Sequence, residues 1–278
     1  MQINKAIIPV AGWGTRRLPI TKVIEKAMLP IGNRPLVDYV VEDCAKAGIK
    51  EVYLVIDEKP FSQIKAYYEE NAKLNNYLIA RGKSDKLSLT DTSREGLTIH
   101  FYAQKDVDNR YGSAEPVAQV VREYNIDEPC VILMGDDFVY NADGSSDLVR
   151  LMETIEDETD SAMLATEIPL EDVERYGVLK VEDGLLSGIY EKPKKEDAPS
   201  NLINISKYIM SAELLQRIVK YCDENDFGPQ DQEYLITDPI IDHIKAGGKI
   251  HVLPINGQYL DGGSMEGWLH ANNVVCGE

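Results

Sequence analysis

Long apolar runs, paired cysteines and closely spaced histidines are all lacking from this 278-residue chain. No stretch approaches the roughly 20 apolar residues of a membrane-spanning helix, and the N-terminus lacks the pattern of a secretory signal. The four cysteines lie far apart, and Cys44 and Cys130 stand in apolar surroundings where we expect them to pack as small hydrophobic residues. The four histidines have no metal-like spacing. We therefore expect a protein of the reducing cytoplasm with no membrane partner.

Positive charge is scarce, since the formal net charge is −18. Binding of duplex nucleic acid relies on a broad basic surface, so this balance argues against nucleic acid as a partner. Residues 1–35 are the exception, with six basic residues, one acid and a local net charge of +5. At their centre, the apolar run 6–10 leads into the loop 11–19, which holds two glycines and two arginines. Glycines let backbone N–H groups approach a ligand closely, and cations neutralise phosphate, so the loop predicts a polyphosphate site.

Strand and helix patterns alternate over residues 5–135, which predicts an α/β fold with a doubly wound, Rossmann-like sheet flanked by helices. We expect strands at 6–10, 52–56, 97–102 and 130–134, and helices at 36–45, 61–76 and 114–124, with a polar loop to residue 95. Ligands bind beyond the carboxyl ends of such strands. The glycine loop after Val10 and the Gly135-Asp136-Asp137 segment after Met134 are therefore expected on one rim of the sheet.

The second half of the chain predicts a mixed sheet and shows no clear linker, so we expect a single domain over residues 1–278. Further strands are expected at 162–168, 178–181, 186–191, 202–210 and 250–254, and helices at 212–222, 239–246 and 265–273.

The glycine loop differs from two nucleotide-binding fingerprints. No Gly-Lys-Ser/Thr follows it, so it is not a Walker A loop, and Arg17 stands where the dinucleotide fingerprint has a third glycine. Gly-x-Gly alone also fits a plain tight turn. Thr15-Arg16 directly after it and Lys26 ten residues further on favour phosphate binding.

Gly12-Trp13-Gly14-Thr15-Arg16, with Lys26 and Met28-Leu29-Pro30, resembles the start of the sugar-1-phosphate nucleotidyltransferases. The resemblance spans nearly the whole chain. The other matching segments are Gln104, Gly112-Ser113-Ala114, Gly135-Asp136, Tyr176-Gly177-Val178, Glu191-Lys192-Pro193, Ala198-Pro199-Ser200-Asn201-Leu202, Leu235-Ile236-Thr237-Asp238 and Asp261-Gly262. The Glu-Lys-Pro and Ala-Pro-Ser-Asn-Leu strings are typical of the uridylyltransferase branch.

The resemblance implies a GT-A-like nucleotidyltransferase fold, with a nucleotide-binding half at about 1–140 and a sugar-phosphate-binding half at about 141–278. It implies a transferase of carbohydrate metabolism that moves UMP from UTP to glucose 1-phosphate, giving UDP-glucose and pyrophosphate. The expected cofactor is Mg²⁺, and the expected assembly is a homo-oligomer, either a dimer or a tetramer.

The resemblance also assigns residues. The expected catalytic residues are Arg16, Lys26 and Lys192. The expected nucleotide-binding residues are Val10, Ala11, Gly12, Gly14, Thr15, Arg16, Lys26, Gln104, Gly112 and Asp136. The expected sugar-phosphate-binding residues are Gly177, Glu191 and Lys192. Asp136 and Asp261 are the expected metal ligands, and Asp137 is expected behind the metal ligand or exposed to solvent.

Two departures from the family pattern leave alternatives open. Ala27 stands where the family has a glutamate that helps to recognise uracil, and Ser206 stands where it has a glycine before the sugar pocket. A related enzyme with another nucleotide or sugar 1-phosphate is therefore an alternative. So is a catalytically silent relative that binds nucleotide sugars, and the Asp136-Asp137 pair keeps a glycosyltransferase in view. Trp13 could lean on the nucleotide or pack within the protein.

Overall fold

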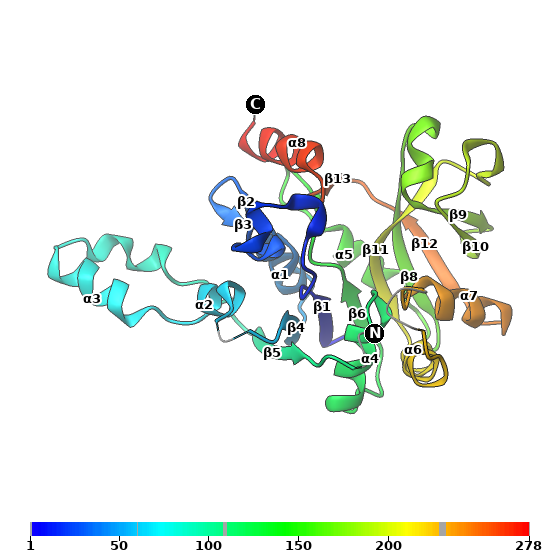
Figure 1. Cartoon of the computed structure of the whole chain (residues 1–278), viewed down its shortest axis with the longest axis horizontal. Coiled ribbons are helices and arrows are strands. Elements are labelled where there is room, and N and C mark those ends of the chain that lie inside the picture. Colours follow the sequence, from blue (N-terminus) through cyan, green and yellow to red (C-terminus); the bar gives the residue numbers. More distant parts are fainter. Residues whose placement is uncertain (1, 60, 108–109, 228–231, 278) are drawn as a thin grey trace.

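A continuous nine-stranded sheet forms the centre of the computed structural model, which describes residues 2–59, 61–107, 110–227 and 232–277 (Figure 1). The strand order is β5-β4-β1-β6-β11-β8-β12-β10-β9. These strands are β1 (Lys5–Pro9), β4 (Glu51–Asp57), β5 (Thr98–Gln104), β6 (Cys130–Leu133), β8 (Ser161–Glu167), β9 (Gly177–Glu182), β10 (Leu185–Glu191), β11 (Leu202–Met210) and β12 (Ile250–Pro254). Two short antiparallel pairs lie outside it: β2 (Pro30–Ile31) with β3 (Arg34–Pro35), and β7 (Asp137–Tyr140) with β13 (Gln258–Asp261).

The first half of the sheet is parallel and the second half is mixed. β1 runs parallel to both β4 and β6, and β4 runs parallel to β5. β11 is antiparallel to β6 and to β8, whereas β12 is parallel to β8. Both the strand–helix alternation expected over residues 5–135 and the mixed α/β class are confirmed.

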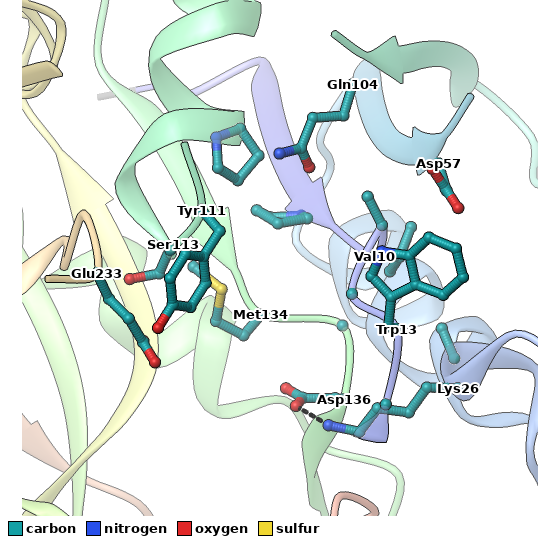
Figure 2. Close-up of a pocket in the computed structure, with 18 of the residues that line it drawn as sticks. Val10, Trp13, Lys26, Asp57, Gln104, Tyr111, Ser113, Met134, Asp136 and Glu233 are labelled. Carbon is teal, nitrogen blue, oxygen red and sulfur yellow. Dashed lines mark hydrogen bonds and ion pairs between the residues drawn. The ribbon is translucent and has the colours of Figure 1, made fainter. Parts of the chain in front are cut away.

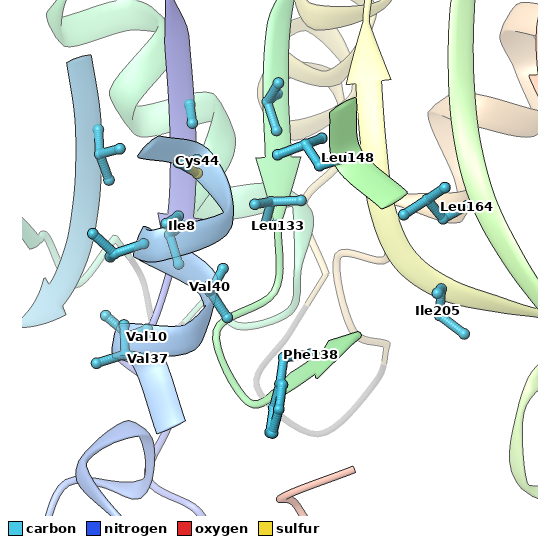
Figure 3. Packing of buried hydrophobic residues seen from close by; sticks show 14 of the residues in the cluster. Ile8, Val10, Val37, Val40, Cys44, Leu133, Phe138, Leu148, Leu164 and Ile205 are labelled. Atoms are coloured by element: carbon cyan, nitrogen blue, oxygen red, sulfur yellow. The ribbon is translucent and has the colours of Figure 1, made fainter. Parts of the chain in front are cut away.

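Helices cover both faces of this sheet because successive strand residues point in opposite directions. Ile8 packs with α1 (Leu36–Lys46) and α5 (Asp147–Glu153) on one face (Figure 3). Ile7 packs on the other face, whose helices are α4 (Ala114–Glu123), α6 (Ala212–Glu224) and α7 (Thr237–Lys245). Cys44 and Cys130 are fully buried, as expected, and burial raises the pKa of both thiols.

The remaining helical segments are short or peripheral. α8 (Met265–Cys276) packs beside β2 and β13 near the C-terminus. The 3-10 turns are η1 (Thr15–Arg17), η2 (Ile20–Lys22), η3 (Lys26–Met28), η4 (Ser84–Leu89), η5 (Leu170–Arg175) and η6 (Lys195–Asp197). Within the described residues, no helix is long and apolar enough to cross a membrane.

The prediction of one continuous helix at 61–76 is wrong. The segment forms α2 (Gln63–Tyr68) and α3 (Ala72–Ala80), each begun by a capping side chain, Ser62 for α2 and Asn71 for α3. Together with η4, these helices form an arm, residues 61–97, that projects away from the sheet (Figure 1). The carboxylate of Asp38 on α1 ties the arm to the body, because it accepts hydrogen bonds from Arg94 at 3.1 Å.

Three elements near the sheet were not expected from the sequence: α5, β7 and β13. Each has seven residues or fewer, too few for a clear periodicity. The buried Asp147 at the start of α5 fixes this region, because it accepts hydrogen bonds at 2.9 Å from the backbone N–H groups of Asn256 and Gly257. Burial alone would raise the pKa of Asp147, but these N–H groups, with Arg150 and Asn141, outweigh burial and lower it.

Replacing Asp147 with alanine should lower the free energy of unfolding by about 3 kcal/mol at pH 7, because two buried N–H groups lose a charged acceptor. A lowered pKa in the folded state stabilises the fold above the unfolded pKa of about 3.9 and ceases to do so as pH falls through the folded value. The difference between wild type and Asp147→Ala, measured by urea denaturation, should therefore shrink below about pH 4. The exposed Asp242→Ala should change stability by less than about 0.5 kcal/mol; an equal loss in both variants contradicts the assignment.

Candidate active site

A cavity of about 750 Å³ opens at the carboxyl ends of β1, β4, β5 and β6 (Figure 2). Its lining includes nine of the ten residues expected to bind the nucleotide, namely Val10, Ala11, Gly12, Gly14, Thr15, Lys26, Gln104, Gly112 and Asp136. Arg16, Gly177, Glu191, Lys192 and Asp261 are not part of this lining. The shared rim expected for the glycine loop and the Gly135-Asp136 segment is therefore present.

The glycine loop turns sharply beneath the cavity. Gly14 has a φ of +63°, and a Cβ built there lies 3.0 Å from both Lys26 Cβ and Thr21 Cγ2. A side chain at this position would thus be strained and would push against Lys26. A Cβ built on Gly12 meets nothing within 4 Å, so that position leaves open space for a ligand.

The two arginines of the loop have different surroundings. The Arg17 side chain is 4% exposed, donates to the Ser264 carbonyl at 2.6 Å and lies over the Trp268 ring. Arg17 therefore ties the loop to the start of α8, whereas Arg16 remains exposed. Trp13 is 70% exposed at the cavity, which argues against a packing role for this residue.

The two acids after β6 point in opposite directions. Asp136 forms an ion pair with Lys26 at the cavity (Figure 2). Asp137 is 8% exposed, forms an ion pair with Lys207 and accepts a hydrogen bond from the Tyr259 hydroxyl at 2.9 Å. Of the two placements expected for Asp137, exposure to solvent is wrong, because Lys207 and Tyr259 hold this side chain inside the protein.

The charges around these acids set their protonation. Burial alone would raise the pKa of Asp136, but Lys26 first, and then Lys207 and Arg16, lower it below its ordinary value. Burial raises the pKa of Asp137 to about 6, although Lys207 acts in the opposite direction. Asp136 is therefore the carboxylate that stays ionised at the cavity.

Asp261 reaches the same place from the other end of the chain. β13 pairs with β7 so that Asp261 lies opposite Asp137, and the Gly262 N–H donates to the Asp136 carbonyl at 3.1 Å. A Cβ built on Gly263 lies 2.8 Å from Asp261 Oδ1, 3.2 Å from Lys26 Nζ and 3.4 Å from Arg16 Nη2. Two cations and the Asp261 carboxylate thus meet around Gly263, and Asp136 joins them through its ion pair with Lys26.

The segment expected to hold the sugar phosphate lies at the ends of β9 and β10. Gly177 pairs with Glu191, whose carboxylate oxygens lie 3.1 and 3.4 Å from a Cβ built on Gly177. Lys192 follows with a φ of +47°, is exposed and donates its N–H to the Tyr176 carbonyl at 3.0 Å. Burial raises the pKa of Tyr176, the residue before Gly177.

Backbone groups and small residues also line the cavity. Gly112 has a φ of +131°, and a Cβ there would lie 2.5 Å from the backbone of Tyr234. Ala27 is 2% exposed and contributes to the lining. The carboxylate of Glu25 turns away to the start of α2, where it accepts the Ile64 N–H at 2.9 Å.

Other cavity-lining residues were not identified from the sequence, among them Asp57, Tyr111, Met134 and Glu233. Asp57 ends a parallel strand, so the rule that located Asp136 could also have found it. Glu233 comes from a segment that joins the site through the Tyr234 N–H, which donates to the Tyr111 carbonyl at 2.9 Å. That contact between distant segments has no local sequence signal.

The nucleotidyl transferase family model matches residues 5–276. A UTP–glucose-1-phosphate uridylyltransferase of Streptococcus pyogenes serotype M3 is 32% identical over 276 residues, covering 96% of this chain and 87% of the relative.

Two solved structures are also similar to this chain. A UTP-bound UGPase from Acinetobacter baumannii has a TM-score of 0.85 at 27% identity, covering 98% of this chain and 93% of that one. A UDP-glucose pyrophosphorylase complexed with UDP-glucose has a TM-score of 0.78 at 29% identity, covering 99% of both chains.

The buried pair behind the site gives a stability prediction. Lys207→Met and Asp137→Val should each lower the free energy of unfolding by about 3–5 kcal/mol, because each leaves one buried charge without its partner. The double variant should lie within about 1–2 kcal/mol of wild type, because both charges are then gone. Chemical denaturation of the four proteins measures this coupling, with the exposed Lys220→Met as the control. Additive losses in the double variant would contradict the pairing.

Proposed function

Because the chain belongs to the nucleotidyl transferase family, we propose that it is an enzyme that transfers UMP from UTP to glucose 1-phosphate. The products are UDP-glucose and pyrophosphate. The observation that carries the proposal is the meeting of Arg16, Lys26 and Asp261 around Gly263, with Asp136 paired to Lys26. Such a cluster suits a reaction between two phosphate anions.

The phosphate of the sugar attacks the α-phosphorus of UTP, and pyrophosphate leaves. The protein need supply little covalent chemistry; positioning and charge neutralisation are its main contributions. Lys26 is assigned to the α-phosphate, because its ammonium group lies at the cavity. Arg16, beside it, is assigned to the leaving pyrophosphate. Loss of one such contact costs about 10²–10³ in rate.

The residues present fit a divalent cation, which we propose is Mg²⁺. Asp136 and Asp261 supply two carboxylates, and the described residues hold no cluster of three or more potential ligand side chains. Magnesium is usually bound by one or two carboxylates together with substrate phosphates and water, so two carboxylates suffice. When bound, the ion neutralises phosphate charge. Asp137 stays behind Asp136, because Lys207 and Tyr259 hold it.

Glucose 1-phosphate is assigned to the ends of β9 and β10. Lys192 is exposed at the end of β10 and can reach a phosphate, while the neighbouring Glu191 can accept hydrogen bonds from sugar hydroxyls. Gly177, opposite Glu191, lacks a side chain that would fill the space for a sugar ring.

The base is assigned to the other end of the cavity. Backbone groups of Val10, Ala11, Gly12 and Gly112 line it, and the Gln104 amide offers both a donor and an acceptor to uracil. Gly14 and Thr15 also line the cavity, directly before Arg16 in the chain, and are assigned to the triphosphate.

We further propose a cytoplasmic homo-oligomer, since nucleoside triphosphates are cytoplasmic metabolites. Support for self-association comes from the arm, which exposes apolar side chains at Leu74, Tyr77, Ile79 and Leu89. Exposed apolar groups gathered on a projecting segment favour burial against another chain.

A matrix of nucleoside triphosphates against sugar 1-phosphates, read as pyrophosphate release, tests the activity. We expect UTP with glucose 1-phosphate to give the highest kcat/KM. Another preferred pair would identify a related enzyme with a different nucleotide or sugar 1-phosphate. Ala27 and Ser206, which depart from the family pattern, are the reason for testing that alternative. No pyrophosphate from any pair would sink the proposal, and tight UDP-glucose binding without turnover would then indicate a silent relative.

Replacing Lys192 with alanine should raise the KM for glucose 1-phosphate by about 10-fold or more, because a phosphate loses its cation. The KM for UTP should change much less, since Lys192 lies outside the cavity that holds the nucleotide. Steady-state kinetics with each substrate varied in turn measure both values. Lys194→Ala, two residues further along and also exposed, is the matched control. Equal effects on both substrates would count against the role of Lys192.

A further inference from the structure

Asp57 and Gln104 stand side by side at one end of the cavity. They are register partners at the ends of the parallel strands β4 and β5. Partners in neighbouring parallel strands point to the same face of the sheet, and both side chains line the cavity (Figure 2). Lys26 and Asp136 lie toward the other end in the same view. A carboxylate and an amide are thus presented together, away from the phosphate-binding cations.

Neighbouring contacts hold both strand ends in place. The amide of Gln119 on α4 donates to the Lys105 carbonyl and accepts the Lys105 N–H, both at 2.9 Å, directly after Gln104. Lys59 Nζ pairs with Asp57 Oδ2 at 2.9 Å, and the Lys59 N–H donates to the Asp57 carbonyl at 2.9 Å. Strand ends held in this way present their side chains from a fixed backbone, which lowers the entropic cost of recognising a ligand.

Ala27, in the segment after the glycine loop, lines the cavity with a methyl group, and Glu25 contacts the start of α2 instead. Two carboxylates near Gln104 in the chain or in the sheet line the cavity, Asp57 and Asp106. Asp57 is the one that pairs with Gln104 across neighbouring strands, which places its side chain on the same face.

We propose that Asp57 determines base specificity, with its Oδ1 accepting the N3–H of uracil while the Gln104 amide donates to the adjacent base carbonyl. The assignment rests on the proposed function, because it requires a nucleotide with its phosphates at Lys26. Lys59 keeps its place on Oδ2 and balances the charge of the carboxylate.

The chemistry of the two pyrimidine bases predicts which nucleotide Asp57 favours. Uracil carries a donor at N3, whereas cytosine carries a lone pair there, and a carboxylate can only accept. Asp57 therefore favours UTP and repels CTP. Thymine has the same N3–H, so Asp57 does not distinguish UTP from dTTP.

Asp57→Asn tests the proposal because asparagine keeps the shape and can turn its NH₂ group toward cytosine N3. We expect the ratio of kcat/KM for UTP to that for CTP to fall by about 10- to 100-fold, through a weaker UTP and a stronger CTP reaction. Asp57→Ala should lose UTP affinity without gaining CTP. An unchanged ratio in Asp57→Asn would overturn the assignment.

Lys59→Gln is the matched control, because it tests the alternative that Asp57 acts only by placing Lys59. The proposal expects the UTP-to-CTP ratio to change by less than about 3-fold in this variant, and a loss equal to that of Asp57→Asn overturns it. Calorimetric titration of UTP and CTP without a sugar phosphate gives the same comparison independently of turnover. The titration also separates the proposed activity from the base assignment. If wild type binds UTP but yields no product with any sugar phosphate, the proposed activity is wrong, and the affinities for UTP and CTP still test the role of Asp57.

Discussion

The antiparallel pairing of β7 with β13 is the interaction on which the site depends. It places Asp261 opposite Asp137 and fixes the Asp136 backbone through the Gly262 N–H. Asp136, in the turn before β7, forms its ion pair with Lys26 at the cavity, whereas Asp137, the first residue of β7, contacts Lys207 and Tyr259 behind it. Two adjacent carboxylates thereby obtain different surroundings, one facing the ligand and the other neutralised inside the protein.

This arrangement also explains how an acidic chain can bind a triphosphate. The net charge is −18, yet the residues that converge at Gly263 include Arg16 and Lys26. Lys26 is held in place by its ion pair with Asp136 and by the tight turn at Gly14. Electrostatic attraction for phosphate is therefore a local property of one rim of the sheet, and the bulk charge contributes little because salt screens distant groups.

Much of the architecture could be predicted from the sequence, because short apolar runs such as 6–10 and 130–134 are typical of buried strands. The strand–helix alternation and the shared rim of Val10 and Asp136 follow from that pattern. The β7–β13 pair could not be predicted, since four-residue strands separated by more than 100 residues have no local period. The position of Arg17 also escaped prediction: its charge suggested phosphate binding, whereas tertiary contact with α8 buries it. Asp57 was overlooked although it ends a strand in the same way as Asp136.

The contacts of Arg17 bear on the order in which parts of the chain can fold during synthesis. The loop that receives the nucleotide is encoded at the very start of the chain, but its anchor, the Ser264 carbonyl beneath the Trp268 ring, is encoded near the end. Asp261 lies in the same late stretch. During synthesis the first strands can form their parallel sheet early, whereas the phosphate-binding rim has to wait for the last helix. Nucleotide can therefore stabilise the phosphate-binding rim only after the residues that carry Asp261 and Ser264 have been added to the chain.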